Sequence, residues 1–390
     1  MTDNTVKLGI DNLIENHLYL IKNKNIALLA NIASVNNKNK PTSLLLYEII
    51  GSRLKKILAP EHGFYGFKEY MVKIESEFDL NLKIPIYSLY GDDIEPSDNM
   101  LADIDTLIFD LQDIGVRYYT YASTLALCMK KCSILHKELI ILDRPNPLSG
   151  NVVQGTILEK GFESFVGQLN IPIRHGLTIG ELALLIKDYF KYELSFTVVK
   201  MQNWRRDMFW DDTNLYWIQP SPNMPTWKTA IFYPGTCLLE GTNISEGRGT
   251  TKPFEIIGSP WINPFELASF LNNLNLPHIS ALPVFFIPKF DKYQNEKCGG
   301  IQLCISNPKA NSYNALIKII EFLYHNHKKN FKWRPPPYEF NYNIMPFDLL
   351  NGTDKIRLLI ENNDNLDNFI EETQNKLLNY CDFKKQYHLY

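Results

Sequence analysis

The sequence lacks the short motifs that mark several large classes of protein. Its six cysteines form no Cys-x-x-Cys pair, which excludes a zinc ribbon and a thioredoxin-type motif. Neither a Gly-x-Gly-x-x-Gly nor a Gly-x-x-x-x-Gly-Lys-Ser/Thr segment follows the first strands, so the chain carries no nucleotide-binding fingerprint. His-x-x-x-His and other dense spacings of metal ligands are also missing. We therefore expect no cofactor and no metal site.

Long apolar runs and clustered charge are missing too. No segment reaches the roughly 18 apolar residues that span a bilayer. The N-terminus has no basic start followed by an unbroken apolar run, so we expect no signal peptide, no membrane partner and a cytoplasmic location, or a periplasmic or secreted one if the start is truncated. The 40 Lys and Arg are scattered among 43 Asp and Glu, and the net charge of −3 argues against a nucleic-acid partner.

What the chain does have is the composition of an ordinary globular protein. Its 390 residues, 45% of them hydrophobic and 21% charged, suffice for two cores of moderate size. Cys128 and Cys132 stand one helical turn apart in an apolar stretch, and we expect them to be buried reduced thiols. Nothing in the composition indicates an oligomeric state.

The first half alternates short β-branched runs with helical patterns. We expect strands at 25–30, 56–59, 84–89, 106–109 and 139–142, and helices at 42–50 and 119–136. These strands are apolar on both faces, which is typical of a parallel sheet covered by helices on both sides. A helix at 178–190 and a strand at 194–199 could extend the same sheet. The first half therefore predicts a Rossmann-like α/β domain.

The later part of the chain has a different character. Residues 217–261 are rich in Pro, Gly, Asn and Trp, which indicates long ordered loops or a domain junction. Beyond them we expect strands at 282–287 and 300–305 and helices at 313–325, 355–361 and 366–380. The sequence thus predicts a Rossmann-like domain at 1–225 and a smaller α+β domain at 226–390.

Carboxylates follow four consecutive predicted strands. In chain order they are Glu61, then Asp92 and Asp93, then Asp110 and Asp113, then Asp143. Ligands of an open parallel sheet bind outside the carboxyl ends of its strands. We therefore expect one polar rim that carries the chemistry.

Such a rim suits hydrolysis of a glycosidic bond. That reaction needs a proton for the leaving oxygen and stabilisation of an oxocarbenium-like transition state, usually from two carboxyl groups. Pro60 and Phe64 flank Glu61, and a partly apolar setting favours the protonated form that a general acid needs. The alternative for Glu61 is a carboxylate that caps a helix or ties a loop. Asp110 and Asp113 are candidates to orient water, hold a sugar hydroxyl or bind a cation, or they bond to loop amides.

Arginines and aromatic residues in the same segments have two interpretations each. Four arginines lie in loop-like settings where a guanidinium binds a carboxylate or supports the structure: Arg117, Arg144, Arg174 and Arg248. Seven aromatic residues suit the apolar faces of sugar rings or belong to the core: Tyr87, Tyr90, Tyr118, Tyr119, Tyr121, Trp227 and Tyr233. A rival enzyme class is a metal-dependent hydrolase that uses His62, Asp110 and Asp113.

Several blocks of sequence together resemble a known family. They include Ala59-Pro60-Glu61-His62-Gly63-Phe64, Phe109-Asp110-Leu111-Gln112-Asp113, Leu142-Asp143-Arg144-Pro145-Asn146-Pro147, Arg174-His175-Gly176, Glu240-Gly241-Thr242-Asn243 and Gly247-Arg248-Gly249-Thr250. In this order they are similar to the signatures of the exo-β-N-acetylmuramidase family (NamZ-like, formerly the family of unknown function DUF1343). The similarity spans roughly residues 55–261 and is looser in the last third.

The resemblance implies an exo-acting glycosidase that releases terminal N-acetylmuramic acid from the non-reducing end of peptidoglycan fragments. It also implies that the Rossmann-like domain carries the active site and that the C-terminal auxiliary domain completes the cleft. The glutamate of the family's Pro-Glu-His-Gly block maps to Glu61. A sugar-binding protein without turnover is a further alternative.

The predicted site follows from these blocks. The catalytic candidates are Glu61, Asp110 and Asp113, with the substrate's own 2-acetamido group or one of the aspartates stabilising positive charge. Arg117 or Arg144 is expected to pair with the lactyl carboxylate of the sugar. The substrate-binding candidates are His62, Gln112, Arg117, Tyr118, Tyr121, Asp143, Arg144, Asn146, His175, Glu240, Asn243 and Arg248. The chain departs from the family at Ala30-Asn31-Ile32-Ala33-Ser34, where the family has a Thr-Asn-x-Thr-Gly turn, and in lacking an export signal.

Overall fold

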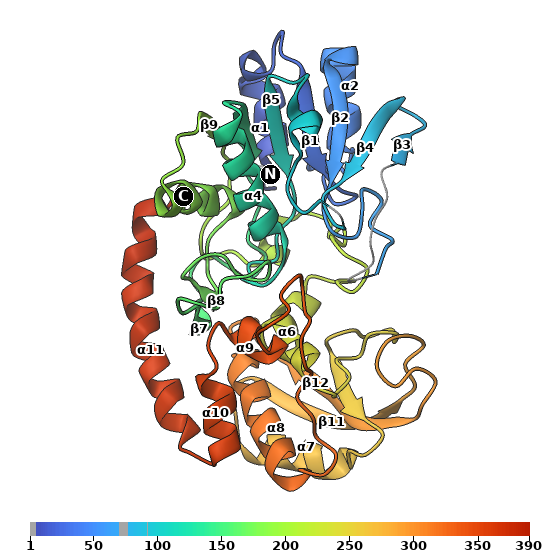
Figure 1. Cartoon of the computed structure of the whole chain (residues 1–390), viewed down its shortest axis with the longest axis vertical. Helices are drawn as coiled ribbons and strands as arrows, with labels where there is room; N and C mark the ends of the chain where they lie inside the picture. The colour runs from blue at the N-terminus through green and yellow to red at the C-terminus, as the bar shows by residue number, and fades with distance from the viewer. Residues whose placement is uncertain (1–4, 70–76, 92) are drawn as a thin grey trace.

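The computed structural model describes residues 5–69, 77–91 and 93–390. It has two parts, one above the other in Figure 1, with the N-terminal half of the chain in the upper part. Asp92, one of the predicted rim carboxylates, lies outside the described residues. Over the described ranges, no helix combines the length and the apolar character needed to cross a membrane. The compartment named from the N-terminal sequence stays a prediction.

A mostly parallel sheet forms the centre of the upper part. Its order in the described residues is β3-β4-β2-β1-β5-β6-β9, and β3 is the antiparallel member. The strands are β1 (Ile26–Ala30), β2 (Leu54–Ala59), β3 (Glu77–Asp79), β4 (Ile84–Ser88), β5 (Thr106–Asp110), β6 (Glu138–Leu142) and β9 (Phe196–Val199). The predicted parallel sheet is confirmed, and β9 continues it beyond the first five strands. Because β2, β4, β5 and β6 are parallel, their carboxyl ends lie at the same edge.

Helices cover both faces of this sheet, as the apolar strands predict. Successive side chains of a strand point to opposite faces. Ala27 and Leu29 of β1 therefore share a core with α4 (Tyr121–Ile134) and α5 (Ile179–Phe190). The alternate residues of β1 belong to a second core with α1 (Gly9–Asn16) and α2 (Thr42–Ile50). Cys128 and Cys132 of α4 are free and buried, which confirms their predicted state.

The start of α4 differs from the prediction. The helical pattern began at Tyr119, but the helix begins at Tyr121. Val116 forms an antiparallel bridge with Arg174, and the Arg117 amide donates to the Ile173 carbonyl at 2.7 Å. These bonds hold residues 116–117, which precede the helix, in a non-helical conformation. Residues 118–120 are therefore loop residues at the carboxyl edge of the sheet rather than the first turn of a helix.

Short elements lie beside the main sheet. They are α3 (Asp98–Leu101), the antiparallel pair β7 (Gln154–Ile157) and β8 (Pro172–Arg174), and the 3-10 turns Leu18–Leu20, Gly51–Arg53 and Trp210–Thr213. The helix α5 begins where its sequence predicts, because Thr178 and Glu181 cap it reciprocally. The predicted boundary at 225/226 lies between the turn at Trp210–Thr213 and the first helix of the lower part.

The lower part is an antiparallel sheet with helices. Its strands are β10 (Ile256–Ser259), β12 (Cys298–Ile305) and β11 (Ile279–Phe286), in that order across the sheet. The helices α6 (Thr229–Thr236), α7 (Pro264–Asn273) and α8 (Ser312–Asn326) belong to it. Residues 217–261, expected to be long ordered loops or a domain junction, also contain the regular elements α6 and β10. Both are short, and Pro234 and Gly235 inside α6 hide the helical pattern.

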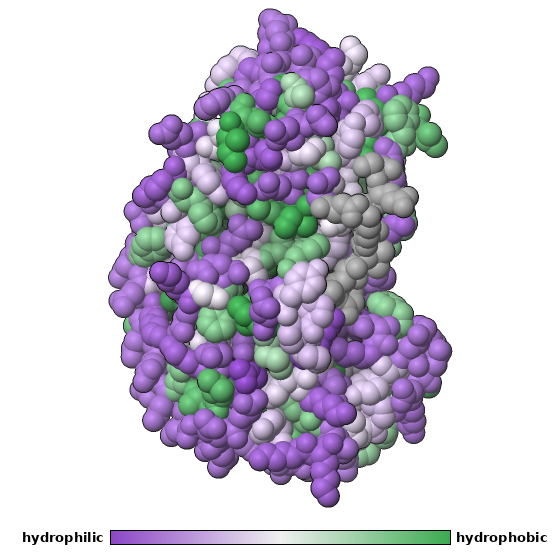
Figure 2. All heavy atoms as spheres, viewed as in Figure 1, coloured by the Kyte–Doolittle hydropathy of each residue, from purple (hydrophilic) through white to green (hydrophobic). Residues whose placement is uncertain are grey.

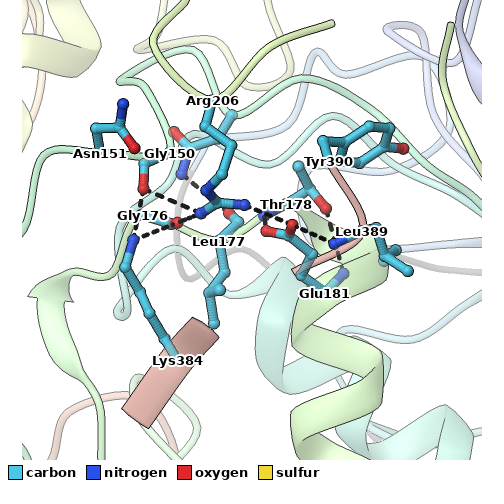
Figure 3. A network of polar contacts seen from close by, with 12 residues as sticks. Gly150, Asn151, Gly176, Leu177, Thr178, Glu181, Arg206, Lys384, Leu389 and Tyr390 are labelled. Atoms are coloured by element: carbon cyan, nitrogen blue, oxygen red, sulfur yellow. Dashed lines mark hydrogen bonds and ion pairs between the residues drawn. The ribbon is translucent and has the colours of Figure 1, made fainter. Parts of the chain in front are cut away.

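The chain then returns to the upper part. After α9 (Pro346–Asn351) and α10 (Lys355–Asn362), the long helix α11 (Leu366–Phe383) runs along one side of the molecule (Figure 1). The 3-10 turn Lys384–Tyr387 follows it. Lys384 donates to the carbonyls of Gly150 and Gly176 beside Arg206, whose guanidinium bonds to Glu181 (Figure 3).

Hydrophilic side chains dominate the surface seen in Figure 2, and apolar residues form small separate groups on it. The apolar mass of the protein instead lies in the cores around the two sheets. The fold is thus the predicted combination of a Rossmann-like α/β part and a smaller α+β part.

Candidate active site

A narrow cavity is lined by residues of both parts of the chain. From the first part come Glu61, His62, Tyr118, Tyr119, Thr120, Val166, Ser221, Asn223 and Met224, and from the second come Tyr233, Glu240, Arg248, Phe254, Tyr338 and Glu339. The open space within it is about 30 Å³, enough for water rather than for a sugar ring. Lining side chains must therefore move before a sugar enters.

Glu61 reaches the cavity from a tight turn after β2. The turn is closed by the Gly63 amide, which donates to the Pro60 carbonyl at 3.0 Å. His62 and Gly63 have φ of 72° and 78°, the left-handed region that a non-glycine residue enters only under local constraint. Thr120 Oγ1 donates to Glu61 Oε2 at 2.8 Å, and 6% of Glu61 is exposed. The turn thus holds a buried carboxylate at the edge of the cavity.

A group of charged residues forms part of the opposite wall. Arg248 Nη2 donates to Glu240 Oε1 at 2.8 Å, and the Tyr338 hydroxyl donates to Glu240 Oε2 at 2.7 Å. Arg248 Nε also lies 3.2 Å from Glu246 Oε1. Charge-assisted bonds of this kind fix the direction of both groups. Glu240 and Arg248 are therefore pre-oriented by their own contacts.

Glu339 brings a further carboxyl group to the cavity. It lies next to Tyr338, and Glu339 and Phe340 have φ of 43° and 64°. Such left-handed backbone costs about 1–3 kcal/mol per residue and is often found at functional sites. The Tyr90 hydroxyl is 3.0 Å from Glu339 Oε2. Burial, and then the charge of Glu61, raise the pKa of Glu339 well above its ordinary value.

Aromatic rings support this wall. Tyr90, Phe165 and Phe340 contact one another with ring centroids 5.5–6.1 Å apart. On the other side, Tyr233 contacts Tyr118 at 5.6 Å and Phe254 at 4.7 Å in edge-to-face geometry. Among the seven predicted sugar-binding aromatics, the structure brings Tyr118, Tyr119 and Tyr233 to the cavity lining.

Five of the predicted site residues meet in the cavity. They are Glu61, His62, Tyr118, Glu240 and Arg248. The Nδ1 atom of His62 lies 2.9 Å from the Lys68 carbonyl, and the Tyr118 hydroxyl donates to the Pro234 carbonyl at 2.5 Å. The latter bond joins the first part of the chain to α6 of the second.

Asp110 and Arg144 lie outside the cavity and bind each other. Arg144 Nε and Nη2 donate to the two Asp110 oxygens at 2.6 and 2.9 Å, and Thr42 Oγ1 donates to Asp110 Oδ2 at 2.6 Å. Asp110 is fully buried and 3% of Arg144 is exposed. The predicted roles of Asp110 in catalysis and of Arg144 in holding the lactyl carboxylate do not fit this arrangement, because neither residue lines the cavity that holds Glu61.

Asp113, Gln112 and His175 also lie away from the cavity. Asp113 Oδ2 accepts from the Gly115 amide at 2.6 Å, and His175 Nε2 is 3.8 Å from the same oxygen. Burial raises the pKa of Asp113 to about 7 and lowers the pKa of His175 to about 3. Gln112 donates to the carbonyls of Asp113 and Pro145 at 2.7 and 2.9 Å. These residues tie loops together at the sheet edge.

The metal-dependent alternative gains no support from these positions. His62 lines the cavity, whereas Asp110 is bound to Arg144 and Asp113 to a loop amide. In the described part of the chain, no three His, Cys, Asp or Glu side chains are placed to hold a metal ion together.

Arg117 and Tyr121 are used for structure. The buried guanidinium of Arg117 donates to the carbonyls of Thr156, Ile171 and Leu350 at 2.7–2.8 Å. The Tyr121 hydroxyl donates to the Pro220 carbonyl at 2.7 Å and accepts from Asn31 at 2.7 Å. Asn31 belongs to the turn that departs from the family pattern.

The last predicted ligands are occupied by bonds within the protein as well. Asn146 Nδ2 donates to the Leu177 carbonyl at 2.9 Å. Asp143 accepts from Thr178 Oγ1, the Gly180 amide and the Tyr390 hydroxyl, each at 2.8 Å. Asn243 Nδ2 donates to the Asn330 carbonyl at 2.8 Å. None of the three lines the cavity among the residues described.

The sequence reasoning missed several cavity residues. Thr120 was assigned to a helix, and six further residues were not named as site residues: Ser221, Asn223 and Met224, which lie in a block that also resembles the family, and Phe254, Tyr338 and Glu339. Tyr338 and Glu339 did carry a signal, because they follow three prolines and precede Phe340.

A larger cavity of about 430 Å³ lies elsewhere, between α11 and the β7–β8 pair. Its lining is mainly apolar, with Leu158, Ile171, Leu185 and Phe383 among its residues. Size favours this cavity, but Glu159 is the carboxylate of its lining, whereas the narrow cavity holds three glutamates. Glycosidic hydrolysis depends on paired carboxyl groups, so we place the chemistry in the narrow cavity.

Comparisons with known proteins match nearly the whole chain. The family models "Exo-beta-N-acetylmuramidase NamZ, N-terminal" and "Exo-beta-N-acetylmuramidase NamZ, C-terminal" match residues 26–228 and 231–390. The chain is 41% identical over 389 residues to the peptidoglycan beta-N-acetylmuramidase NamZ of Bacillus subtilis (strain 168), covering 99% of this chain and 91% of that protein.

Solved structures give the same result. Crystal structures of two DUF1343 family proteins from Bacteroides fragilis NCTC 9343 superpose on the model with TM-scores of 0.88 and 0.76. They are 31% and 30% identical to it, and each match covers 99% of both chains. The chain therefore belongs to the exo-β-N-acetylmuramidase NamZ family.

Proposed function

We propose that this protein releases terminal N-acetylmuramic acid from the non-reducing end of peptidoglycan fragments, with Glu61 as a catalytic carboxyl group. Its family membership makes it a glycosidase. The observation that carries the assignment to Glu61 is its place in a cavity that both parts of the chain line and that gathers three glutamates and an arginine.

The chemistry of the cavity suits a glycosidase. Breaking a glycosidic bond requires a proton donor and a group that stabilises positive charge at the anomeric carbon. Asp110 and Asp113 are bound elsewhere, so the partner of Glu61 is the substrate's 2-acetamido group or another carboxyl group of the cavity.

Arg248 is the arginine of the lining and replaces Arg117 and Arg144 as our candidate for the lactyl carboxylate. Its guanidinium is held by Glu240 and Glu246, which fixes its direction before substrate binds. Tyr118 and Tyr233 offer ring edges and faces to the apolar side of the sugar.

The decisive experiment compares two disaccharides that differ in their non-reducing end. We expect the protein to release N-acetylmuramic acid from a disaccharide that begins with this sugar, and to leave a disaccharide that begins with N-acetylglucosamine intact. Mass spectrometry of the products measures both. Absence of release from the disaccharide that begins with N-acetylmuramic acid contradicts the proposal, and so does equal cleavage of the two disaccharides. A chelator is expected to leave turnover unchanged, and loss of turnover in its presence supports the metal-dependent alternative instead.

A further inference from the structure

Two carboxyl groups from different parts of the chain line the same narrow cavity. Glu61 follows β2 in the first part, and Glu339 belongs to the loop before α9 in the second. Thr120 Oγ1 donates to Glu61 Oε2 at 2.8 Å, and the Tyr90 hydroxyl donates to Glu339 Oε2 at 3.0 Å. Only 6% of each glutamate is exposed. Two buried carboxyl groups thus border the same small space.

Glu339 is the carboxyl group of the cavity whose surroundings favour the protonated form. Burial, and then the charge of Glu61, raise its pKa well above the ordinary value. The third glutamate of the lining, Glu240, is instead bound to Arg248 and Tyr338. Two neighbouring buried carboxyl groups do not both ionise at neutral pH, because each negative charge opposes the other in a medium of low polarity.

We propose that Glu339 is the second carboxyl group of the catalytic centre and holds the single proton of the Glu61–Glu339 pair. This inference rests on the proposed glycosidase function and revises the role that the sequence suggested for Glu61. Glu61 is the ionised member, on the side of the developing positive charge, and Glu339 is the proton donor. The catalytic centre is then incomplete until the loop of the second part is in place.

The proposed step balances as follows. The bond between the anomeric carbon and the glycosidic oxygen breaks, its electron pair stays on that oxygen, and the oxygen takes the proton of Glu339. Water then adds to the anomeric carbon, and the proton it releases returns to the pair. Glu61 stabilises the positive charge between these events, directly or through the 2-acetamido group of the sugar.

The test uses two substrates whose leaving groups need protonation to different degrees. A disaccharide has a poor leaving group that requires a proton, whereas a nitrophenyl N-acetylmuramide has a good one that does not. We expect Glu339→Gln to lower kcat/KM for the disaccharide about 100-fold or more, in line with the usual contribution of a general acid. For the nitrophenyl substrate we expect less than a 10-fold loss and no alkaline limb in the pH profile.

Asp348→Asn is the matched control, because Asp348 is a buried carboxylate of the same part of the chain, bound to Arg357 away from the cavity. It should affect both substrates equally and keep the alkaline limb. Equal losses on both substrates in Glu339→Gln, with the alkaline limb retained, overturn the proposal and leave Glu339 a structural residue.

A second measurement is independent of turnover. Titration of the Glu339 carboxyl group, followed by carbon NMR, should show a lower pKa in Glu61→Gln than in the unmodified protein, since the neighbouring charge is gone. An unchanged pKa overturns the pairing even if the protein turns over both substrates. A lowered pKa in a protein that turns over neither substrate supports the pairing and contradicts the glycosidase proposal.

Discussion

The carboxylates at the sheet edge and those in the cavity have similar burial but different partners. Asp110 meets a guanidinium and a hydroxyl, and Asp143 accepts from two hydroxyls and an amide. Both sets of bonds lie within the first part and the C-terminal turn that docks on it. Glu61 and Glu339 instead come from different parts of the chain and line one cavity.

The partners of a carboxylate distinguish a structural residue from a catalytic candidate more clearly than its position in the sequence does. All four strand ends carry acidic residues in the sequence, yet among the described residues only the turn after β2 directs its carboxylate into the cavity. Asp110 and Asp143, at the ends of β5 and β6, close local networks instead. A carboxylate whose bonds are satisfied inside its own loop has little capacity left for a substrate.

Among tests of this difference between sheet-edge and cavity carboxylates, we expect the largest effect on turnover at Glu61. Glu61→Gln preserves the shape of the side chain but removes its charge, so we expect kcat/KM for the disaccharide to fall at least about 1,000-fold. Steady-state assays measure this change, and circular dichroism with thermal unfolding establishes that the variant is folded. A folded variant with near-normal turnover contradicts the assignment of Glu61.

Asp110→Asn should lower stability and leave turnover nearly unchanged, which is the reverse of the result expected for Glu61→Gln. It leaves the Arg144 guanidinium buried beside a neutral group, and breaking a buried ion pair on one side costs about 3–5 kcal/mol. We expect denaturant unfolding to reveal this loss, while kcat/KM of the folded fraction stays within about 3-fold. Thr42→Val, which removes only the hydroxyl donor to Asp110, should cost less stability. A large loss of turnover in folded Asp110→Asn would return Asp110 to the active site.

Tyr338→Phe tests the opposite wall of the cavity. It removes the hydroxyl that donates to Glu240 Oε2, and a bond to a charged group is worth about 1.5–3 kcal/mol. Because Glu240 orients Arg248, we expect KM for a substrate with a lactyl carboxylate to rise roughly 10-fold, with a smaller change in kcat. If KM is unchanged and stability alone falls, the wall does not contact the acidic group of the sugar.

The smallest effect on turnover is expected for Asp113→Asn. Burial raises the pKa of Asp113 to about 7 in the folded protein, above its ordinary value of 3.8, so the folded state binds this proton more tightly. The stability it contributes is fully present below pH 3.8 and is lost as pH rises through about 7. The variant resembles the protonated form, so its unfolding free energy should lack this part of the pH dependence.

Urea unfolding between pH 5 and 8 measures the difference between the two proteins, and disaccharide turnover should remain within about 3-fold. A variant that keeps the full pH dependence, or loses turnover like Glu61→Gln, shows that Asp113 is ionised or catalytic.

Local sequence patterns predicted the parts of the molecule that local forces determine. Strands such as Leu139 to Leu142 are apolar on both faces, and that pattern alone indicates a covered parallel sheet. The cap of Thr178 and Glu181 likewise marks the start of α5. The short helix α6 was missed because Pro234 and Gly235 weaken its local preference and its contacts with α8 form it instead.

The candidate site was predictable only in part, for a related reason. Glu61 stands in a distinctive turn whose own hydrogen bonds place it, so its local sequence carries information. Tyr90 and Glu339 are 249 positions apart, and only the folded arrangement of the two parts brings them together. The sequence also did not show that Arg117 and Arg144 are bound within the protein. Arg117 donates to the distant carbonyl of Leu350, and Arg144 donates to the carboxylate of Asp110.

The return of the C-terminal segment to the upper part has a mechanical consequence. The lower part is covalently tied to the upper one through the chain before α6, and it is tied again where α11 ends and Lys384 binds the carbonyls of Gly150 and Gly176. Side chains of the upper part add further ties, since Arg117 donates to the Leu350 carbonyl and Tyr118 to the Pro234 carbonyl. These ties oppose separation of the two parts, and they keep Glu61 and Glu339 on the same cavity.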